Sequence, residues 1–123
     1  MPVQLSDGER RLPDQGVLET VSAALLAIYG DHYGRAPKQA KTYLNDNVLV
    51  CVLQEDLLTA HEIGAVRRGD DDDVLTGRIA FQREHEARFV AAVERLTGRR
   101  VEAFLSANQT RPGVAAELFI LAR

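Results

Sequence analysis

Apolar side chains recur at three- and four-residue spacings in two stretches of the chain, and this pattern predicts two long helices. The first stretch begins at residue 14, and its apolar stripe consists of Val17, Val21, Ala24, Leu25 and Ile28. Gly30, Gly34 and Pro37 follow the stripe. Glycine just after a helix and proline soon after it are common stop signals, so we expect the helix to end there.

The second stretch covers residues 74–97 and is closed by Gly98. Its expected core side consists of Leu75, Ile79, Phe89, Val93 and Leu96, with Phe81 and Ala92 at the margin. A shorter helix is predicted before it, ending near Val66. Thr59 and Glu62 have the spacing of a capping box, in which each side chain bonds to the backbone N–H of the other residue.

Four segments have the composition and length of β-strands. They cover residues 38–44, 48–53, 100–105 and 114–121. Turn residues 45–47 separate the first pair, and a loop over residues 108–113 with a Pro-Gly turn separates the second pair. The segments 48–53 and 114–121 are apolar on both faces, apart from Glu117. Since a strand with one solvated face alternates with polar residues, these two strands need cover on both sides.

The elements therefore follow the order helix, two strands, helices, two strands. The simplest packing is an α+β fold, in which helices lie on one face of a four-stranded, mainly antiparallel sheet. Pairings of the βαβ type are the alternative. The other face of the sheet is also apolar, so we expect it to lie in a homodimer interface. Residues 13–123 are expected to form one domain, after a flexible N-terminal tail over residues 1–12.

Composition and charge narrow the function classes. The 123 residues are 46% hydrophobic and 27% charged, which is typical of a globular domain. A net charge of −3 disfavours nucleic-acid binding, because phosphate contacts need a basic face. No segment approaches the ~18–20 apolar residues of a membrane span, and the N-terminus lacks the apolar region of a signal peptide. We therefore expect a cytoplasmic protein that reaches a membrane only through a partner.

The single cysteine, Cys51, lies within the apolar segment 48–53. This position predicts a buried thiol that packs as a small hydrophobic side chain. One cysteine allows no disulfide within the chain, and a buried thiol fits a reducing compartment.

The long helix carries one anomaly. Arg78, Gln82, His85 and Glu86 fall among its core positions on a helical wheel. An adjacent His and Glu, with Arg and Gln one turn earlier, could bind an anion or relay a proton. The alternative is that these side chains face a wet subunit interface or pair with one another. No other acid, base or nucleophile has a diagnostic spacing to them, so no catalytic residue is assigned.

The spacing of the acidic residues and histidines gives little support for a metal site. The aspartates at residues 70–73 lack the alternation and the distal Glu of a calcium loop, and acids there favour the dipole of a helix start. His61 would begin a zinc-protease motif, but Ala65 stands where the second His belongs. His32 is explained as a cation at a helix end. We expect no metal and no cofactor.

Three motifs, taken in order, resemble a known family. They are YGRAP at residues 33–37, LTAHE at residues 58–62, and LTGRRV at residues 96–101 followed by Ser106 and ELFIL at residues 117–121. Together they are similar to the small bacterial MpsC-like (YbcI-like) family, named for a sodium-translocating, membrane-potential-generating system. The similarity extends from about Val17 to Leu121.

The resemblance implies a soluble component of a cation or inorganic-carbon uptake system that works with membrane partners. Because two strands are apolar on both faces and no catalytic constellation is present, we expect a non-enzymatic accessory or regulatory protein that contacts such a membrane transport component. The resemblance brings no catalytic residues. The positions that match the family pattern are Gly34, Arg35, Pro37, Thr59, Gly98 and Arg99. Arg35 and Arg99 are the candidate contacts to an anion or partner, or they bond to nearby helix-end carbonyls. The alternative function is a small-molecule or anion-binding domain, or a weak enzyme, that uses Arg78, His85 and Glu86 with Arg35 or Arg99.

Overall fold

A computed structural model describes residues 15–123. The predicted tail over residues 1–12 and the predicted domain start at residue 13 lie outside the described residues. The elements are α2 (Gln15–Tyr33), β1 (Gln39–Asn45), β2 (Val48–Gln54), α3 (Ala60–Arg67), α4 (Asp71–Thr97), β3 (Val101–Thr110) and β4 (Gly113–Leu121). This order matches the predicted one.

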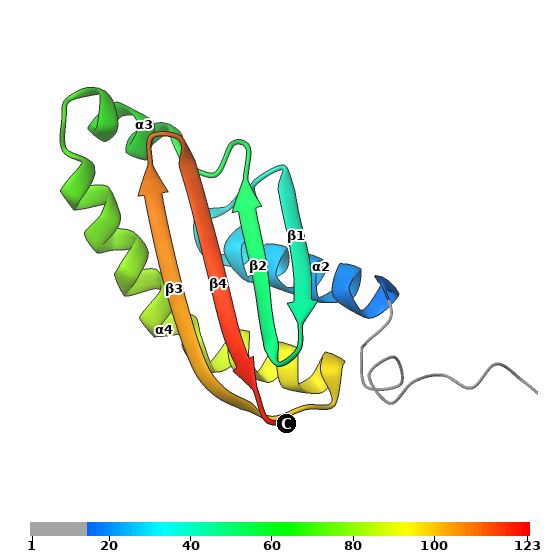
Figure 1. Cartoon of the computed structure of the whole chain (residues 1–123). Helices are drawn as coiled ribbons and strands as arrows, with labels where there is room; N and C mark the ends of the chain where they lie inside the picture. The colour runs from blue at the N-terminus through cyan, green and yellow to red at the C-terminus, as the bar shows by residue number, and fades with distance from the viewer. Residues whose placement is uncertain (1–14) are drawn as a thin grey trace, which may run out of the picture.

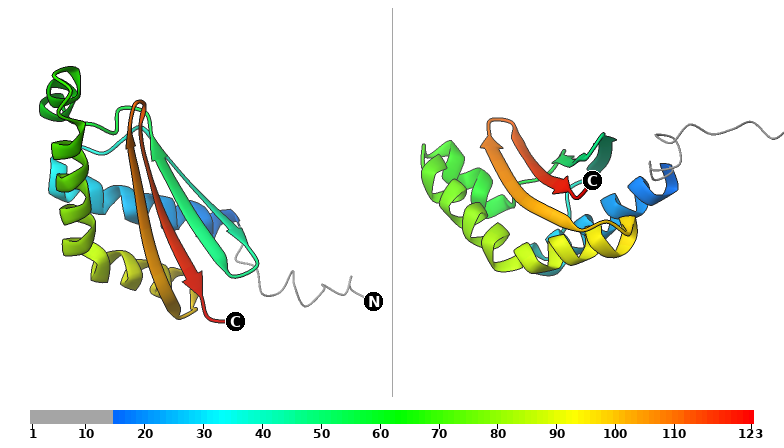
Figure 2. Two further views of the ribbon diagram at one scale, coloured as in Figure 1. Left: turned by 60° about the vertical axis from the view of Figure 1, so that its left-hand side comes forward. Right: turned by 60° about the horizontal axis from the view of Figure 1, so that its bottom comes forward.

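The four strands form one sheet in the order β1-β2-β4-β3, and every neighbouring pair is antiparallel. Helices α2 and α4 lie against one face of the sheet, while α3 lies beyond one end of it, near the turn between β3 and β4 (Figures 1 and 2). No described element covers the opposite face. The predicted α+β fold is therefore confirmed, and the βαβ alternative is wrong because no two neighbouring strands are parallel.

The two central strands have the alternation that their sequences predict. Side chains that face the helices are fully buried, and they include Leu49, Cys51 and Leu53 of β2 and Ala115, Phe119 and Leu121 of β4. The intervening side chains are half-buried on the uncovered face: Val48, Val50 and Val52 of β2, and Val114, Ala116, Leu118 and Ile120 of β4. Glu117 is in phase with the buried set, so its carboxyl group lies under the helices.

Strand β3 is longer than predicted. Residues 108–110, predicted as a loop, continue the strand, and Thr110 pairs with Gly113 across the two-residue connection of Arg111 and Pro112. The loop prediction is wrong because polar residues are tolerated on an edge strand, where one side can meet solvent. A register shift between Val101 and Ala103 also interrupts the pairing of β3 with β4.

Helix α4 begins three residues earlier than predicted. Residues 71–73 of the aspartate run form its first turn, and Asp71 accepts hydrogen bonds from Thr110 Oγ1 at 2.6 Å and from Arg111 Nη2 at 2.9 Å. These bonds hold the pKa of Asp71 down at about 2. The acidic run therefore starts the helix, as expected, and also attaches it to the turn between β3 and β4.

The buried side of α4 is rotated from the predicted one. Phe89 and Val93 are buried as expected, but Ile79 is 44% exposed, and that part of the prediction is wrong. The buried positions before Phe89 are Val74, Arg78, Phe81 and Gln82. Because adjacent helical residues point about 100° apart, burial of Arg78 turns Ile79 outward.

Other local predictions are confirmed. Val21, Leu25 and Ile28 of α2 are buried, and Ser22 and Tyr29 extend the same face. The capping box of α3 is formed in both directions: Glu62 N–H donates to Thr59 Oγ1 at 3.2 Å, and Thr59 N–H donates to Glu62 Oε1 at 2.9 Å. Cys51 is buried, which raises the pKa of its thiol to about 11.

Two glycines, one within α4 and one directly after it, should respond in opposite ways to replacement by alanine. Gly77 lies within the helix with no atom within 4 Å of an added Cβ, so we expect Gly77→Ala to raise the free energy of unfolding by about 0.5–1 kcal/mol. Gly98 ends the helix at φ +70°, so Gly98→Ala should lower it by about 1–2 kcal/mol. Urea unfolding measures both changes, and a shift of the same sign in both variants would contradict this account of the helix end.

Candidate functional site

The most unusual side chain in the core is Glu117, which is fully buried in β4. Its carboxylate accepts a hydrogen bond from the Tyr29 hydroxyl of α2 at 2.8 Å and another from Gln82 Nε2 of α4 at 3.3 Å. The Ser106 hydroxyl of β3 donates a third. Sequence reasoning missed this site, although one signal was present: Glu117 interrupts an apolar strand on the side that faces the helices.

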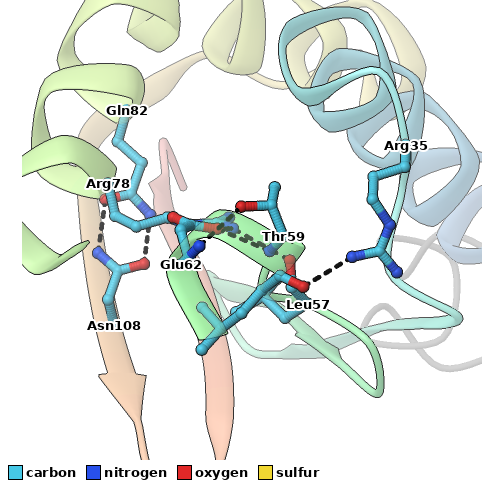
Figure 3. Close-up of polar contacts among 8 residues, drawn as sticks. Arg35, Leu57, Thr59, Glu62, Arg78, Gln82 and Asn108 are labelled. Carbon is cyan, nitrogen blue, oxygen red and sulfur yellow. Dashed lines mark hydrogen bonds and ion pairs between the residues drawn. The ribbon is translucent and has the colours of Figure 1, made fainter. Parts of the chain in front are cut away.

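Gln82 extends the network toward the sheet edge. It exchanges two hydrogen bonds with Asn108 of β3, at 3.1 Å and 2.8 Å, which connects α4 with the edge strand (Figure 3). A groove of about 320 Å³ runs beside this pair, lined by Ile79, Gln82, Arg83, Glu86, Phe104 and Ser106. Two partners of Glu117 therefore line a groove, and the carboxyl group is one hydrogen bond away from it.

The surroundings of Glu117 favour its neutral form. Burial raises the pKa of Glu117, and the hydrogen bonds from Ser106, Tyr29 and Gln82 lower it by less. Burial, together with the nearby Glu117 carboxylate, also raises the pKa of Tyr29 well above its usual value. The cluster therefore makes ionisation of both Glu117 and Tyr29 less favourable than in water.

A second buried polar contact joins α4 to α3. Arg78 is fully buried, and its Nε and Nη2 donate to the two carboxylate oxygens of Glu62 at 2.8 Å and 2.5 Å. Nη2 also donates to the Leu57 carbonyl at 3.0 Å (Figure 3). The guanidinium carbon lies 4.0 Å from the centroid of the Tyr33 ring, a cation–π contact. Arg78 thus binds three different parts of the chain.

The charge of Arg78 is balanced within the protein. Partial burial acts to raise the pKa of Glu62, but the hydrogen bonds from Arg78 and Thr59 outweigh it and leave that pKa below its usual value. Among the described residues, Arg78 Nη1 and the Tyr33 hydroxyl are buried without a hydrogen-bond partner. Burial raises the pKa of Tyr33 to about 12. The guanidinium therefore has one terminal nitrogen, Nη1, without a hydrogen-bond partner, while Nε and Nη2 are bonded to the Glu62 carboxylate.

The six residues predicted as a ligand or partner site lie in four places. Arg35 Nη1 donates to the Leu58 carbonyl at 2.7 Å, next to the Leu57 carbonyl that Arg78 binds. These two arginines hold consecutive peptide groups of the segment before α3. Their position in one neighbourhood was not evident from the sequence, where they are 43 residues apart.

The other four predicted residues are distributed differently. Gln82 and Glu86 line the groove beside β3. His85 lies next to His32 of α2, with ring nitrogens 3.2 Å apart. Arg99 donates two hydrogen bonds to the Ala122 carbonyl, at 2.9 Å and 3.3 Å. Arg35 and Arg99 thus both bind backbone carbonyls, but these carbonyls lie in a loop and after β4 rather than at helix ends.

A larger cavity lies apart from the buried acid. It measures about 500 Å³, and its lining includes Leu57, Leu58, Ile63, Val66, Pro112 and Val114. The cavity shares the segment before α3 with the arginine contacts, but neither Glu117 nor Arg78 lines it. Its lining also includes Gln54, Glu55, Asp56, Arg67 and Thr110, so polar and charged groups accompany the apolar wall.

Comparison with known protein families decides the assignment. The sequence pattern of the family described as "Na+-translocating membrane potential-generating system (MpsC)" matches residues 15–123. The chain belongs to the MpsC family. The matched region includes every described element, and it contains Arg35, Thr59, Arg99 and the buried Glu117. No curated protein and no solved structure matches the chain.

None of the helices in residues 15–123 combines the length and the apolar composition needed to cross a membrane. The longest, α4, contains many charged residues over its 27 positions.

Replacing Glu117 with glutamine should change how stability depends on pH. Folding raises the pKa of Glu117, so the folded protein binds the carboxyl proton more tightly than the unfolded chain does. The free energy of unfolding therefore falls as the pH rises from the pKa of the unfolded chain through that of the folded protein. The glutamine side chain stays neutral at every pH. We therefore expect the melting temperature of Glu117→Gln to rise relative to that of the wild type as pH increases from about 4.5 to 8. A difference between the two proteins that is constant with pH would contradict the raised pKa.

Replacing Arg78 with methionine should be strongly destabilising. It would leave the Glu62 carboxylate without its partner, and breaking a buried pair in this way costs roughly 3–5 kcal/mol. The matched control is Arg88→Met, because Arg88 also pairs with a carboxylate, that of Asp31 at 2.9 Å, but on the surface. We expect the control to cost less than about 1 kcal/mol. If both variants lose the same free energy of unfolding in denaturant, burial does not determine how much the Arg78 contact stabilises the protein.

Proposed function

We propose that the chain is a non-enzymatic accessory or regulatory component of a bacterial membrane potential-generating system, and that it acts in the cytoplasm through protein–protein contacts. Support for the system comes from the family match over residues 15–123, whose description names Na⁺ translocation. Support for a role through contacts comes from the uncovered face of the sheet. The proposed partners are a second copy of the chain and a membrane transport component.

The uncovered face carries apolar side chains across all four strands. Tyr43 pairs with Val50, Val50 with Leu118, and Leu118 with Leu105, so these residues form one row. The row ends in the two exposed side chains, Tyr43 at 48% and Leu105 at 56%. A second apolar row lies beside it: Val48, Ile120 and Ala103. Contiguous apolar surface of this kind is typical of an interaction site.

The border of this face is polar. Gln54 and Gln39 pair at one end of the sheet, and Gln54 pairs with Val114, which in turn pairs with Gln109. Lys41 lies on β1, beside Tyr43 on the same face. A nearly uncharged centre with a polar border is the composition of a protein interface. The charge of Lys41 lies on the edge strand β1, beside the apolar centre on β2 and β4, so two copies can meet face to face through that centre, as in a symmetric dimer.

The non-enzymatic part of the proposal rests on how the buried polar groups are used. Glu117 and Arg78 each bond to residues from several elements, which is the arrangement expected of groups that fix the packing. The rival function, anion binding by Arg78, His85 and Glu86, has less support. The charge of Arg78 is already balanced by Glu62, and Glu86 lies on the groove beside β3.

The proposed dimer can be tested with Leu105→Asp. Wild-type protein at micromolar concentration should have twice the 13.6 kDa chain mass in light scattering. Leu105→Asp places a charge at the exposed end of the apolar row, so we expect it to shift the mass to that of one chain. Ile79→Asp is the matched control, because Ile79 is an exposed hydrophobic residue of α4, on the covered side of the sheet. It should remain dimeric.

The same variants test the role in the membrane system. In bacterial cells that lack the chain, a potential-sensitive dye should report a lower Na⁺-dependent membrane potential. Wild type and Ile79→Asp should restore it, and Leu105→Asp should not. A wild-type mass of one chain would refute the dimer. Cells whose membrane potential is unaffected by loss of the chain would refute the role as an accessory component.

A further inference from the structure

Two histidines that are distant in the sequence meet on the surface of the helical layer. His32 lies in the last turn of α2, and His85 lies in the middle of α4. Nδ1 of His32 and Nε2 of His85 are 3.2 Å apart. Glu84 adds a carboxylate, so that one ligand atom from each of the three side chains lies within 4.8 Å of the others.

The distance between the two nitrogens suits a shared metal ion. Two nitrogens that bind one tetrahedral Zn²⁺ at its usual bond length of about 2.0–2.1 Å lie roughly 3.3–3.4 Å apart. The observed separation of 3.2 Å is close to this value. Glu84 is exposed, so its side chain is free to turn by the small amount that a metal–oxygen bond requires.

The two imidazole rings are held in position by the protein. The His32 ring lies 4.6 Å from the Phe81 ring, and the His85 ring lies 5.1 Å from the same ring, measured between centroids. Phe81 is buried, so it forms a fixed support beneath both histidines. An ion pair between Asp31 and Arg88 at 2.9 Å joins the same two helices nearby. The donors are therefore brought together before any ion arrives.

Ligand chemistry narrows the identity of the ion. Two imidazole nitrogens and one carboxylate suit Zn²⁺ and its neighbours in the first transition row, whereas Mg²⁺ and Ca²⁺ prefer oxygen donors. We propose that His32, Glu84 and His85 bind one divalent transition-metal ion, with Zn²⁺ as the representative, and that the ion bridges α2 and α4. Three protein ligands leave a fourth position for solvent or for a donor from a partner.

This site differs from the expectation drawn from the sequence. Spacing along the chain indicates no zinc ligand set, because His32 and His85 are separated by 53 residues. Only the packing of α2 against α4 brings them together. The site lies outside the Glu117 network and the apolar sheet face, so the inference stands independently of the proposed function.

The test is a calorimetric titration of chelator-treated protein with Zn²⁺. We expect one ion to bind per chain. Changing one histidine ligand, in His32→Gln or His85→Gln, should weaken binding by more than the roughly 10–100-fold typical of residues that only support a ligand. Glu84→Gln should weaken it by a smaller factor. The control is His61→Gln, since His61 is an exposed histidine of α3 and should leave the affinity unchanged.

Two further measurements make the outcome decisive. Co²⁺ should give the visible absorption of a four-coordinate site in the wild type and in His61→Gln, and lose it in His85→Gln. Zn²⁺ should raise the melting temperature of the wild type but not of the histidine variants, whose metal-free melting temperatures check that they fold. Absence of stoichiometric Zn²⁺ binding, or equal affinity in the wild type and both histidine variants, would overturn the proposal.

Discussion

A carboxyl group buried in the middle of a sheet must be satisfied by hydrogen bonds, and the packing of this chain depends on how Glu117 meets that need. Its three donors come from α2, α4 and β3, so one side chain fixes two helices and an edge strand relative to β4. An apolar residue there would leave the layers free to slide by small amounts. The Arg78 contact with Glu62 plays the same role between α4 and α3.

Much of the fold could be predicted from the sequence, since local patterns determine the elements and their faces. The capping box at Thr59, the helix end at Gly98 and the two-faced strand β2 were each evident. Contacts between distant side chains were not. Periodicity shows that Arg78 and Gln82 lie on the buried side of α4, but it does not reveal that Glu62 and Glu117 meet them there. The candidate sites depend on such contacts.

The residues that carry the family resemblance have clear structural roles. Arg35 binds the Leu58 carbonyl, Thr59 caps α3, and Arg99 binds the Ala122 carbonyl. Gly34 and Gly98 adopt positive φ angles where the helices end. These residues therefore serve the folding of the chain, while the polar groups on the helical layer and the apolar sheet face are where its function is proposed to lie.

The position of β4 has a consequence for how the chain is made. It is the last of the described strands to be synthesised, yet it pairs with both β2 and β3 in the interior of the sheet. Until residues up to Leu121 have left the ribosome, β2 has β1 on one side but lacks its β4 neighbour on the other. The sheet can therefore be completed only after β4 has emerged, and until then the growing chain carries an open apolar edge that chaperones can recognise.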